Sequence, residues 1–282
     1  MRKSINIWSF PAEWTLEAKL RLARAAGFAG IELDLTLDGA VSLGSSTVEL
    51  DAVRAQVERE GLEVSGLATG LYWQFNPVSE DPTVREEART VLRRQIECAA
   101  QLGIDTVLVV PGAVGIPWEA RAAIVPYDTA HTRAADFIRR AMPLAERHRV
   151  VLGIENVWNQ FLPSPVVMAV FIDSFASPWV AAYLDVGNAI AAGHAEHWAK
   201  ILGPRIRRVH FKDYRRAIGT VHGFVDLLSG DVNWPEVMRE LRAANYAGWV
   251  AAEMIPPAPF YRHCPEVLIH NTSRAMDAIL AL

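Results

Sequence analysis

VVLGIE at residues 150–155 is the first of four mainly apolar stretches that each end in a residue able to bind a metal ion. The other three are WVAAYLD at 179–185, IRRVH at 206–210 and WVAAE at 249–253. Runs of this kind are typical of strands in a parallel sheet that is covered by helices. Because the carboxyl ends of the strands of a parallel barrel lie at one rim, we expect the four terminal residues to lie close together.

Outward from these stretches, short strand-like segments alternate with longer segments of helical period. Strands are predicted at residues 4–8, 29–34, 63–68, 106–110, 150–155, 180–185, 206–210 and 249–253. Helices are predicted at residues 15–26, 48–60, 84–102, 132–147, 164–175, 197–202, 234–244 and 265–282. Gly27, Gly61 and Gly103 stand where three of these helices should end.

This alternation over 282 residues predicts a (β/α)8 TIM barrel, a fold of about 250 residues. No Ser/Gly-rich or charged linker divides the sequence, so residues 1–282 are expected to form a single domain. A doubly wound open sheet is the alternative fold. Dinucleotide binding has no support, because the early strand-to-helix turns lack a Gly-x-Gly-x-x-Gly pattern.

The composition narrows the class of protein. Hydrophobic residues make up 51% and charged residues 21%, which is ordinary for a globular chain with a sizeable core. A net charge of -4 argues against nucleic acid as a partner, and no apolar run is long enough to span a membrane. The two cysteines, Cys98 and Cys264, form no disulfide or zinc pattern. We therefore expect a cytoplasmic protein.

The four strand ends supply Glu155, Asp185, His210 and Glu253. Three carboxylates and one imidazole repel one another unless a cation lies between them, and this donor set suits one divalent ion, Mn²⁺, Mg²⁺ or Co²⁺, with Zn²⁺ less favoured. The alternative for any single residue is that a strand merely ends in solvent, or that His210 is a satisfied histidine at the edge of the core. Four consecutive strands with such ends favour the metal site.

Residues two before each strand end should face into the barrel, because side chains alternate along a strand. These residues are Gly153, Tyr183, Arg208 and Ala251. A buried arginine needs a carboxylate, and Glu32 on the second strand is one candidate partner of Arg208, which is interpreted as structural.

The motifs around the strand ends resemble those of a known superfamily. GIENVWNQF at 153–161, LDVGNA at 184–189, VHFKD at 209–213 and AAEM at 251–254 are similar to the xylose-isomerase-like TIM-barrel superfamily of sugar and sugar-phosphate isomerases and epimerases, and resemble its ketose 3-epimerases. The resemblance implies that Glu155, Asp185, His210 and Glu253 bind one divalent metal ion. It also implies that Glu155 and Glu253 form the acid/base pair.

Two further positions are compared through the same resemblance. The epimerases carry a substrate-binding histidine three residues after the metal aspartate, where this chain has Asn188, and an arginine six residues after the metal histidine, which is Arg216 here. A related endonuclease branch holds three zinc ions with additional histidines at earlier strand ends. Here those ends read Ala68-Thr69-Gly70 and Pro111-Gly112, so a trinuclear site is not expected.

Candidate substrate-binding residues lie beyond the strand ends. They are Arg216, Asn188, Lys212, Trp8 and Trp158, with Trp73 and Phe10 as further candidates for the wall of the pocket. His222 lies in the segment 219–233, which lacks a clear helical pattern and is interpreted as a lid.

The predicted function is that of a sugar isomerase or epimerase, acting on a small ketose or aldose or its phosphate by proton transfer through a metal-chelated enediolate. Two alternatives remain open. One is a keto-polyol dehydratase of the inosose type on the same barrel, and the other is a non-catalytic sugar-binding barrel. The expected partner is a small carbohydrate, and formation of a homo-oligomer is left open.

Overall fold

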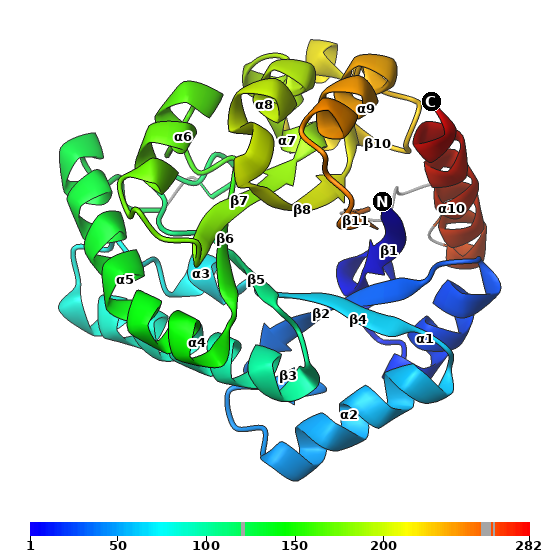
Figure 1. Ribbon diagram of the computed structural model, residues 1–282, viewed down its shortest axis with the longest axis horizontal. Helices are drawn as coiled ribbons and strands as arrows, with labels where there is room; N and C mark the ends of the chain where they lie inside the picture. The colour runs from blue at the N-terminus through cyan, green and yellow to red at the C-terminus, as the bar shows by residue number, and fades with distance from the viewer. Residues whose placement is uncertain (120–121, 255–260, 262) are drawn as a thin grey trace.

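The computed structural model describes residues 1–119, 122–254, 261 and 263–282. Figure 1 shows a ring of strands with helices arranged around its outside. In the described part of the chain, eight parallel strands form this ring in the order β1, β11, β8, β7, β6, β5, β4 and β2, and pairing of β2 with β1 closes it. The predicted (β/α)8 barrel is confirmed, and the open-sheet alternative is wrong.

The barrel strands lie close to the predicted segments. They are β1 (Arg2–Asn6), β2 (Gly30–Thr36), β4 (Glu63–Ala68), β5 (Thr106–Val109), β6 (Val151–Glu155), β7 (Val180–Asp185), β8 (Ile206–Phe211) and β11 (Trp249–Ala252). The first strand differs most from its prediction, because it ends at Asn6 and the chain turns into the short helix η1 (Ile7–Ser9). The Asn6 side chain accepts a hydrogen bond from the Trp8 amide and caps this turn. Trp8 consequently lies beyond the strand, at the rim.

The main helices of the outer layer also follow the predicted order. They are α1 (Leu16–Ala25), α2 (Thr47–Arg59), α4 (Pro82–Leu102), α5 (Tyr127–His148), α6 (Pro165–Asp173), α8 (Ala195–Leu202), α9 (Trp234–Ala243) and α10 (Pro265–Ala281). Thr15 and Ser46 cap the starts of α1 and α2 by accepting hydrogen bonds from backbone amides of the first turn. Gly103 ends α4 at a φ of 77°, which glycine adopts without steric cost.

Short elements that the sequence pattern did not indicate occupy connecting segments. They are β3 (Val41–Ser42), α3 (Leu71–Gln74), α7 (Val186–Ala192), η2 (Gly203–Arg205), β9 (Asp213–Tyr214), η3 (Arg216–Ile218), η4 (Val221–Gly223) and β10 (Phe224–Val225). The strands β9 and β10 pair antiparallel, so the segment interpreted as a lid is anchored by a hairpin that starts just after β8. Most of these elements follow the carboxyl ends of barrel strands, which is where barrels carry their sites.

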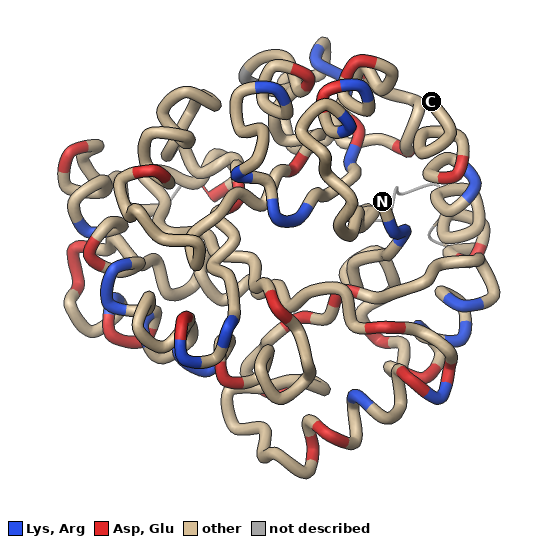
Figure 2. Tube along the Cα trace, in the orientation of Figure 1, with Lys and Arg blue, Asp and Glu red and all other residues tan. Residues whose placement is uncertain are grey.

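Charged residues of both signs are interspersed on the outer helices in the view of Figure 2. Many form pairs within one helix, such as Arg21 with Glu17 at 2.5 Å and Arg140 with Asp136 at 2.7 Å. No helix of the described residues is long and apolar enough to cross a membrane.

The interior of the barrel corrects one prediction. Arg208 does not pair with Glu32, because its guanidinium donates hydrogen bonds to the Ser65 carbonyl oxygen at 3.0 Å and to the Asp105 carboxylate. Asp105 precedes β5 and lies at the amino-terminal end of the barrel, toward which the long Arg208 side chain extends. Glu32 is instead bonded to residues nearer the opposite rim. Two layers of polar side chains are therefore stacked inside the barrel.

Candidate metal centre and active site

Four buried side chains meet at the carboxyl-terminal rim of the barrel. Glu155 and Asp185 are the last residues of β6 and β7, His210 lies in β8, and Glu253 follows β11. These strands are neighbours in the barrel, and Asp185 pairs in register with His210. One ligand atom from each of the four residues lies within 4.8 Å of the others. The structure thus brings together the four residues that the sequence singled out.

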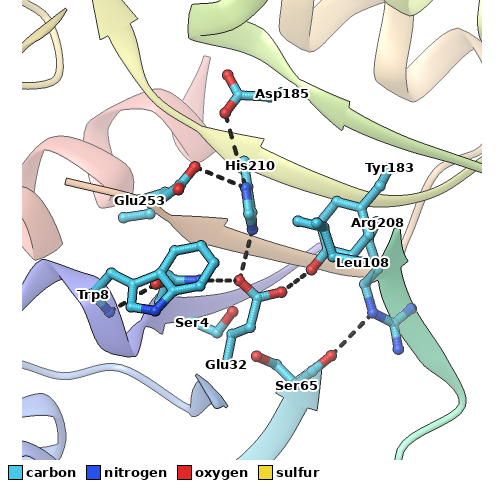
Figure 3. Close-up of polar contacts among 12 residues, drawn as sticks. Ser4, Trp8, Glu32, Ser65, Leu108, Tyr183, Asp185, Arg208, His210 and Glu253 are labelled. Atoms are coloured by element: carbon cyan, nitrogen blue, oxygen red, sulfur yellow. Dashed lines mark hydrogen bonds and ion pairs between the residues drawn. The ribbon is translucent and has the colours of Figure 1, made fainter. Parts of the chain in front are cut away.

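The two ring nitrogens of His210 face different partners. Figure 3 shows the imidazole between Glu32 on one side and the carboxylates of Glu253 and Asp185 on the other. Nε2 lies 2.6 Å from Glu32 Oε2, whereas Nδ1 lies 3.0 Å from Glu253 Oε2 without an aligned hydrogen bond. Nε2 therefore carries the proton that Glu32 accepts, and Nδ1 is left to face a cation.

Glu32 also belongs to the site, although the sequence did not indicate this role. Its fully buried carboxylate also accepts hydrogen bonds from Asn6 Nδ2 at 2.5 Å and from the Tyr183 hydroxyl. Burial raises the pKa of Glu32, but His210, Tyr183 and Asn6 together hold this pKa below its ordinary value. Glu32 is therefore ionised and fixes the His210 ring. The available signal was a glutamate inside the apolar strand GIELDLT.

The carboxylates of the cluster have different proton affinities. Burial, with additional repulsion from Glu253 and Asp185, raises the pKa of Glu155 to about 7. Burial also raises the pKa of Glu253, but Lys212 and His210 outweigh it and hold this pKa well below the ordinary range. Pairs of carboxyl groups with such divergent pKa values are characteristic of acid/base sites.

Lys212 joins the cluster from the residue after β8. Its ammonium lies 2.7 Å from Glu253 Oε2 and 3.1 Å from Asp185 Oδ2, and 4.8 Å from the centre of the Phe224 ring. Burial lowers the pKa of Lys212, but these carboxylates raise it above its ordinary value. Lys212 is consequently a charged group between the cluster and the space above it.

The donor atoms of the cluster fit a divalent cation. Asp185 Oδ2, His210 Nδ1 and Glu253 Oε2 are buried and have no aligned hydrogen bond, although the Lys212 ammonium approaches the two carboxylate oxygens. Burial lowers the pKa of His210, but Glu32 and Glu253 raise it well above its ordinary value. The negative charge of the surrounding carboxylates, which favours a second proton on this imidazole, also attracts a metal ion.

A cavity of about 500 Å³ lies directly over the cluster, with Glu155 and Glu253 in its lining. Five of the predicted pocket residues line it, namely Trp8, Trp73, Trp158, Asn188 and Lys212. The sequence analysis missed Trp118 and Phe224, which line it as well. Two hydrogen bonds hold Asn188 in place. Its backbone N–H donates to Asp185 Oδ1 at 2.7 Å, and its side-chain Nδ2 donates to the Asn156 carbonyl oxygen at 3.1 Å.

The remaining predicted residues are not among the described residues that line this cavity. Arg216 is exposed in η3, and its guanidinium donates to the Gly193 carbonyl oxygen at 2.8 Å. Phe10 is buried in the core, and His222 is exposed in η4. Their roles in substrate binding stay predictions.

Comparisons with known proteins identify the family of the chain and several relatives. Residues 20–270 match the family described as Xylose isomerase-like TIM barrel. L-ribulose-5-phosphate 3-epimerase UlaE of Shigella flexneri is 26% identical over 84% of this chain and 81% of its own length. The 2-epi-5-epi-valiolone 7-phosphate 2-epimerase of an Actinoplanes strain is 30% identical over 71% of this chain and 70% of its own length.

Solved structures support the fold in the same way. D-psicose 3-epimerase, determined in the presence of D-fructose, superposes with a TM-score of 0.82 at 18% identity, and the match covers 100% of both chains. The resemblance found in the sequence motifs is confirmed, and so is the prediction of an enzyme of the sugar isomerase and epimerase class. With a match over most of its length, this chain belongs to the Xylose isomerase-like TIM barrel family.

Proposed function

We propose that the chain is a divalent-metal-dependent epimerase that inverts a hydroxyl-bearing carbon beside the carbonyl group of a small keto-sugar or its phosphate. The observation that carries this proposal is the position of Glu155 and Glu253. Both belong to the four-residue cluster, and both also line the cavity above it. Inversion at such a carbon requires one group that removes the proton and a second that returns it.

The two glutamates take these roles in turn. One carboxylate removes the proton from the carbon and leaves an enediolate, and the other carboxyl group returns a proton to that carbon with the opposite hand. Which glutamate acts first depends on the configuration of the substrate. A divalent ion held by Glu155, Asp185, His210 and Glu253 would withdraw electron density from the carbonyl and hydroxyl oxygens and so acidify the C–H bond between them.

Other residues at the cavity position the substrate. Lys212 and Asn188 carry side-chain donors at its floor, and both are buried. Trp8 and Trp158 cover the apolar face of the carbon chain. Glu32 orients the His210 ring through the 2.6 Å contact with Nε2.

The names of the relatives favour an epimerase over an aldose–ketose isomerase or a keto-polyol dehydratase. A non-catalytic sugar-binding barrel would have no need for two buried glutamates at the metal cluster. Mn²⁺, Mg²⁺ and Co²⁺ are the proposed ions, because the cluster offers three carboxylates and one nitrogen. The cytoplasm stays the predicted compartment.

Proton transfer is tested in D₂O with Mn²⁺-loaded protein and a panel of ketoses and ketose phosphates, by NMR of the carbon beside the carbonyl. We expect product that carries deuterium at the inverted carbon. Glu155→Gln and Glu253→Gln should each reduce turnover by at least about 10³-fold at Mn²⁺ concentrations where metal analysis shows full occupancy. The matched control is Glu63→Gln, at the opposite end of the barrel, where the side chain is 61% exposed.

Two results would contradict the proposal. One is product without deuterium, which indicates a hydride shift between carbons. The other is full turnover in a metal-loaded Glu155→Gln or Glu253→Gln variant.

A further inference from the structure

Most of the described residues that line the cavity have apolar or aromatic side chains. Aromatic rings line it on two sides. Trp73, which follows β4, packs edge-to-face against Trp118 with ring centres 4.9 Å apart. Trp158, which follows β6, packs against Phe224 of β10 with ring centres 5.2 Å apart. Leu108, Val110, Val157 and Val221 fill the lining between and around these rings.

Two of the tryptophans that line the cavity, Trp8 and Trp158, already use their indole N–H groups in hydrogen bonds within the protein. The Trp8 indole N–H donates to Asp34 Oδ2 at 2.7 Å, and the Trp158 indole N–H donates to the Asn188 carbonyl oxygen at 3.3 Å. A ligand therefore meets the faces and edges of these rings and not their N–H groups. Such surfaces recognise apolar or aromatic groups.

The charged groups lie at the floor. Lys212 is the cation among the described lining residues, and its ammonium lies 2.7 Å from Glu253 and 3.1 Å from Asp185. No second cation is among the described lining residues, so this part of the cavity offers no charged partner for an anionic group higher up. The cavity is consequently polar where the reaction takes place and apolar toward its mouth, where Trp118 is 45% exposed.

The space around Trp158 extends this apolar region. A second cavity, of about 210 Å³, shares Val157, Trp158 and Asn188 with the first and is otherwise lined mainly by apolar residues such as Phe161, Leu162 and Trp198. Gln160 and Leu162 of this wall have φ values of 55° and 53°, which non-glycine residues rarely adopt outside sites that impose them. Trp158, in the same loop after β6, lines both cavities.

We propose that the substrate of this site is a neutral keto-sugar derivative that bears an apolar substituent, an alkyl or aryl group, which the aromatic walls bind while the sugar reaches Glu155 and Glu253. This inference rests on the proposed function for the reaction, but its recognition element is separate from the metal cluster.

The experiment compares 3-keto derivatives of phenyl and methyl β-D-glucopyranoside with D-fructose 6-phosphate on the Mn²⁺-loaded protein. Calorimetric titration gives the Kd of each, and NMR in D₂O gives the exchange rate at the carbon beside the carbonyl. One aromatic contact corresponds to roughly threefold to tenfold in affinity. Since several rings line the cavity, we expect the phenyl compound to bind at least about tenfold more tightly than the methyl compound and more tightly than the phosphate.

Trp118→Ala provides the variant, because its half-exposed side chain can be truncated without opening the core. We expect it to lower the phenyl-to-methyl affinity ratio by roughly threefold or more. Tyr127→Ala is the matched control, since Tyr127 is an exposed aromatic residue at the start of α5 that is not among the described lining residues. It should leave the ratio unchanged.

The outcomes separate this inference from the proposed function. Equal affinity for the phenyl and methyl compounds, or tighter binding of the phosphate, overturns the inference even where deuterium exchange proceeds. A phenyl preference that depends on Trp118 supports the inference, and absence of exchange from every compound then counts against the proposed epimerase reaction alone.

Discussion

Glu32→Gln tests whether a residue that contacts His210 but is not itself one of the four proposed ligands controls metal binding by the cluster. The side chain keeps its size, but it loses the charge that holds the proton on His210 Nε2, 2.6 Å away. Glu32 now accepts hydrogen bonds from His210, Asn6 and Tyr183. A glutamine has one acceptor oxygen, and its amide nitrogen is itself a donor, so at least one of these buried donors loses its partner.

The magnitude follows from these contacts. Loss of a carboxylate behind a metal-binding histidine typically weakens metal binding 10- to 100-fold, or by about 1.4–2.7 kcal/mol. One unsatisfied buried donor lowers the free energy of unfolding by about 1–3 kcal/mol. We therefore expect Glu32→Gln to fold, to melt at a lower temperature, and to bind Mn²⁺ at least tenfold more weakly.

Calorimetric titration with Mn²⁺ and melting in the presence of a chelator measure the two effects separately. Glu63→Gln is again the control, because its pair with Arg2 is solvent-exposed and should contribute less than about 1 kcal/mol. A folded Glu32→Gln protein with the Mn²⁺ affinity of the wild type would refute the role assigned to Glu32.

Three further predictions concern metal binding, the sequence-based assignment of Arg216 to the substrate site, and the ion pair of Asp105 with Arg208. Mn²⁺ at about 100 times its Kd should stabilise the protein by about 2.7 kcal/mol, seen as a melting temperature roughly 5 °C above that of the chelated protein, and identical melting curves would exclude binding to the folded state. Arg216→Ala is expected to raise KM about tenfold, the effect of one charge-assisted hydrogen bond, with metal content unchanged, and a wild-type KM would remove Arg216 from the binding residues. Burial raises the pKa of Asp105, but Arg208 and Arg207 outweigh it and hold this pKa below its ordinary value. Its contribution to stability is therefore present above about pH 4 and lost as the pH falls through the lowered pKa. Asp105→Asn should then lower the unfolding free energy by about 1–2 kcal/mol at pH 7, a value reduced by partial exposure, and denaturant titrations that show the same deficit at pH 7 and pH 2 would contradict this.

The barrel and the rim cluster could be predicted because their signals are local. Glu155 and Asp185 each end an apolar run. Such a strand end can be recognised in the sequence without knowing which distant residues it contacts. Parallel topology then requires such ends to gather at one rim, so the position of His210 beside Asp185 follows from the fold class.

The parts that escaped prediction depend on contacts between distant segments. Glu32 and Arg208 both lie inside the barrel and carry opposite charges, which is why they were predicted to pair. The sequence does not show how far each side chain extends along the barrel axis, and Arg208 contacts Asp105 instead. Trp118 lies in a loop and Phe224 in the two-residue strand β10, and both segments are too short or irregular to show a periodic pattern. Trp118 is oriented by contact with Trp73, and Phe224 by its hairpin with β9, and neither contact leaves a pattern in the sequence.

We propose that this cluster binds a metal ion on which proton transfer by Glu155 and Glu253 depends. Its most direct test is deuterium exchange in D₂O at the carbon beside the carbonyl, followed by NMR on one protein sample before chelation, after removal of metal, and after stepwise return of Mn²⁺. We expect exchange to be lost on chelation and to return in proportion to Mn²⁺ up to one ion per chain. Exchange that continues at the same rate in the metal-free protein would contradict it.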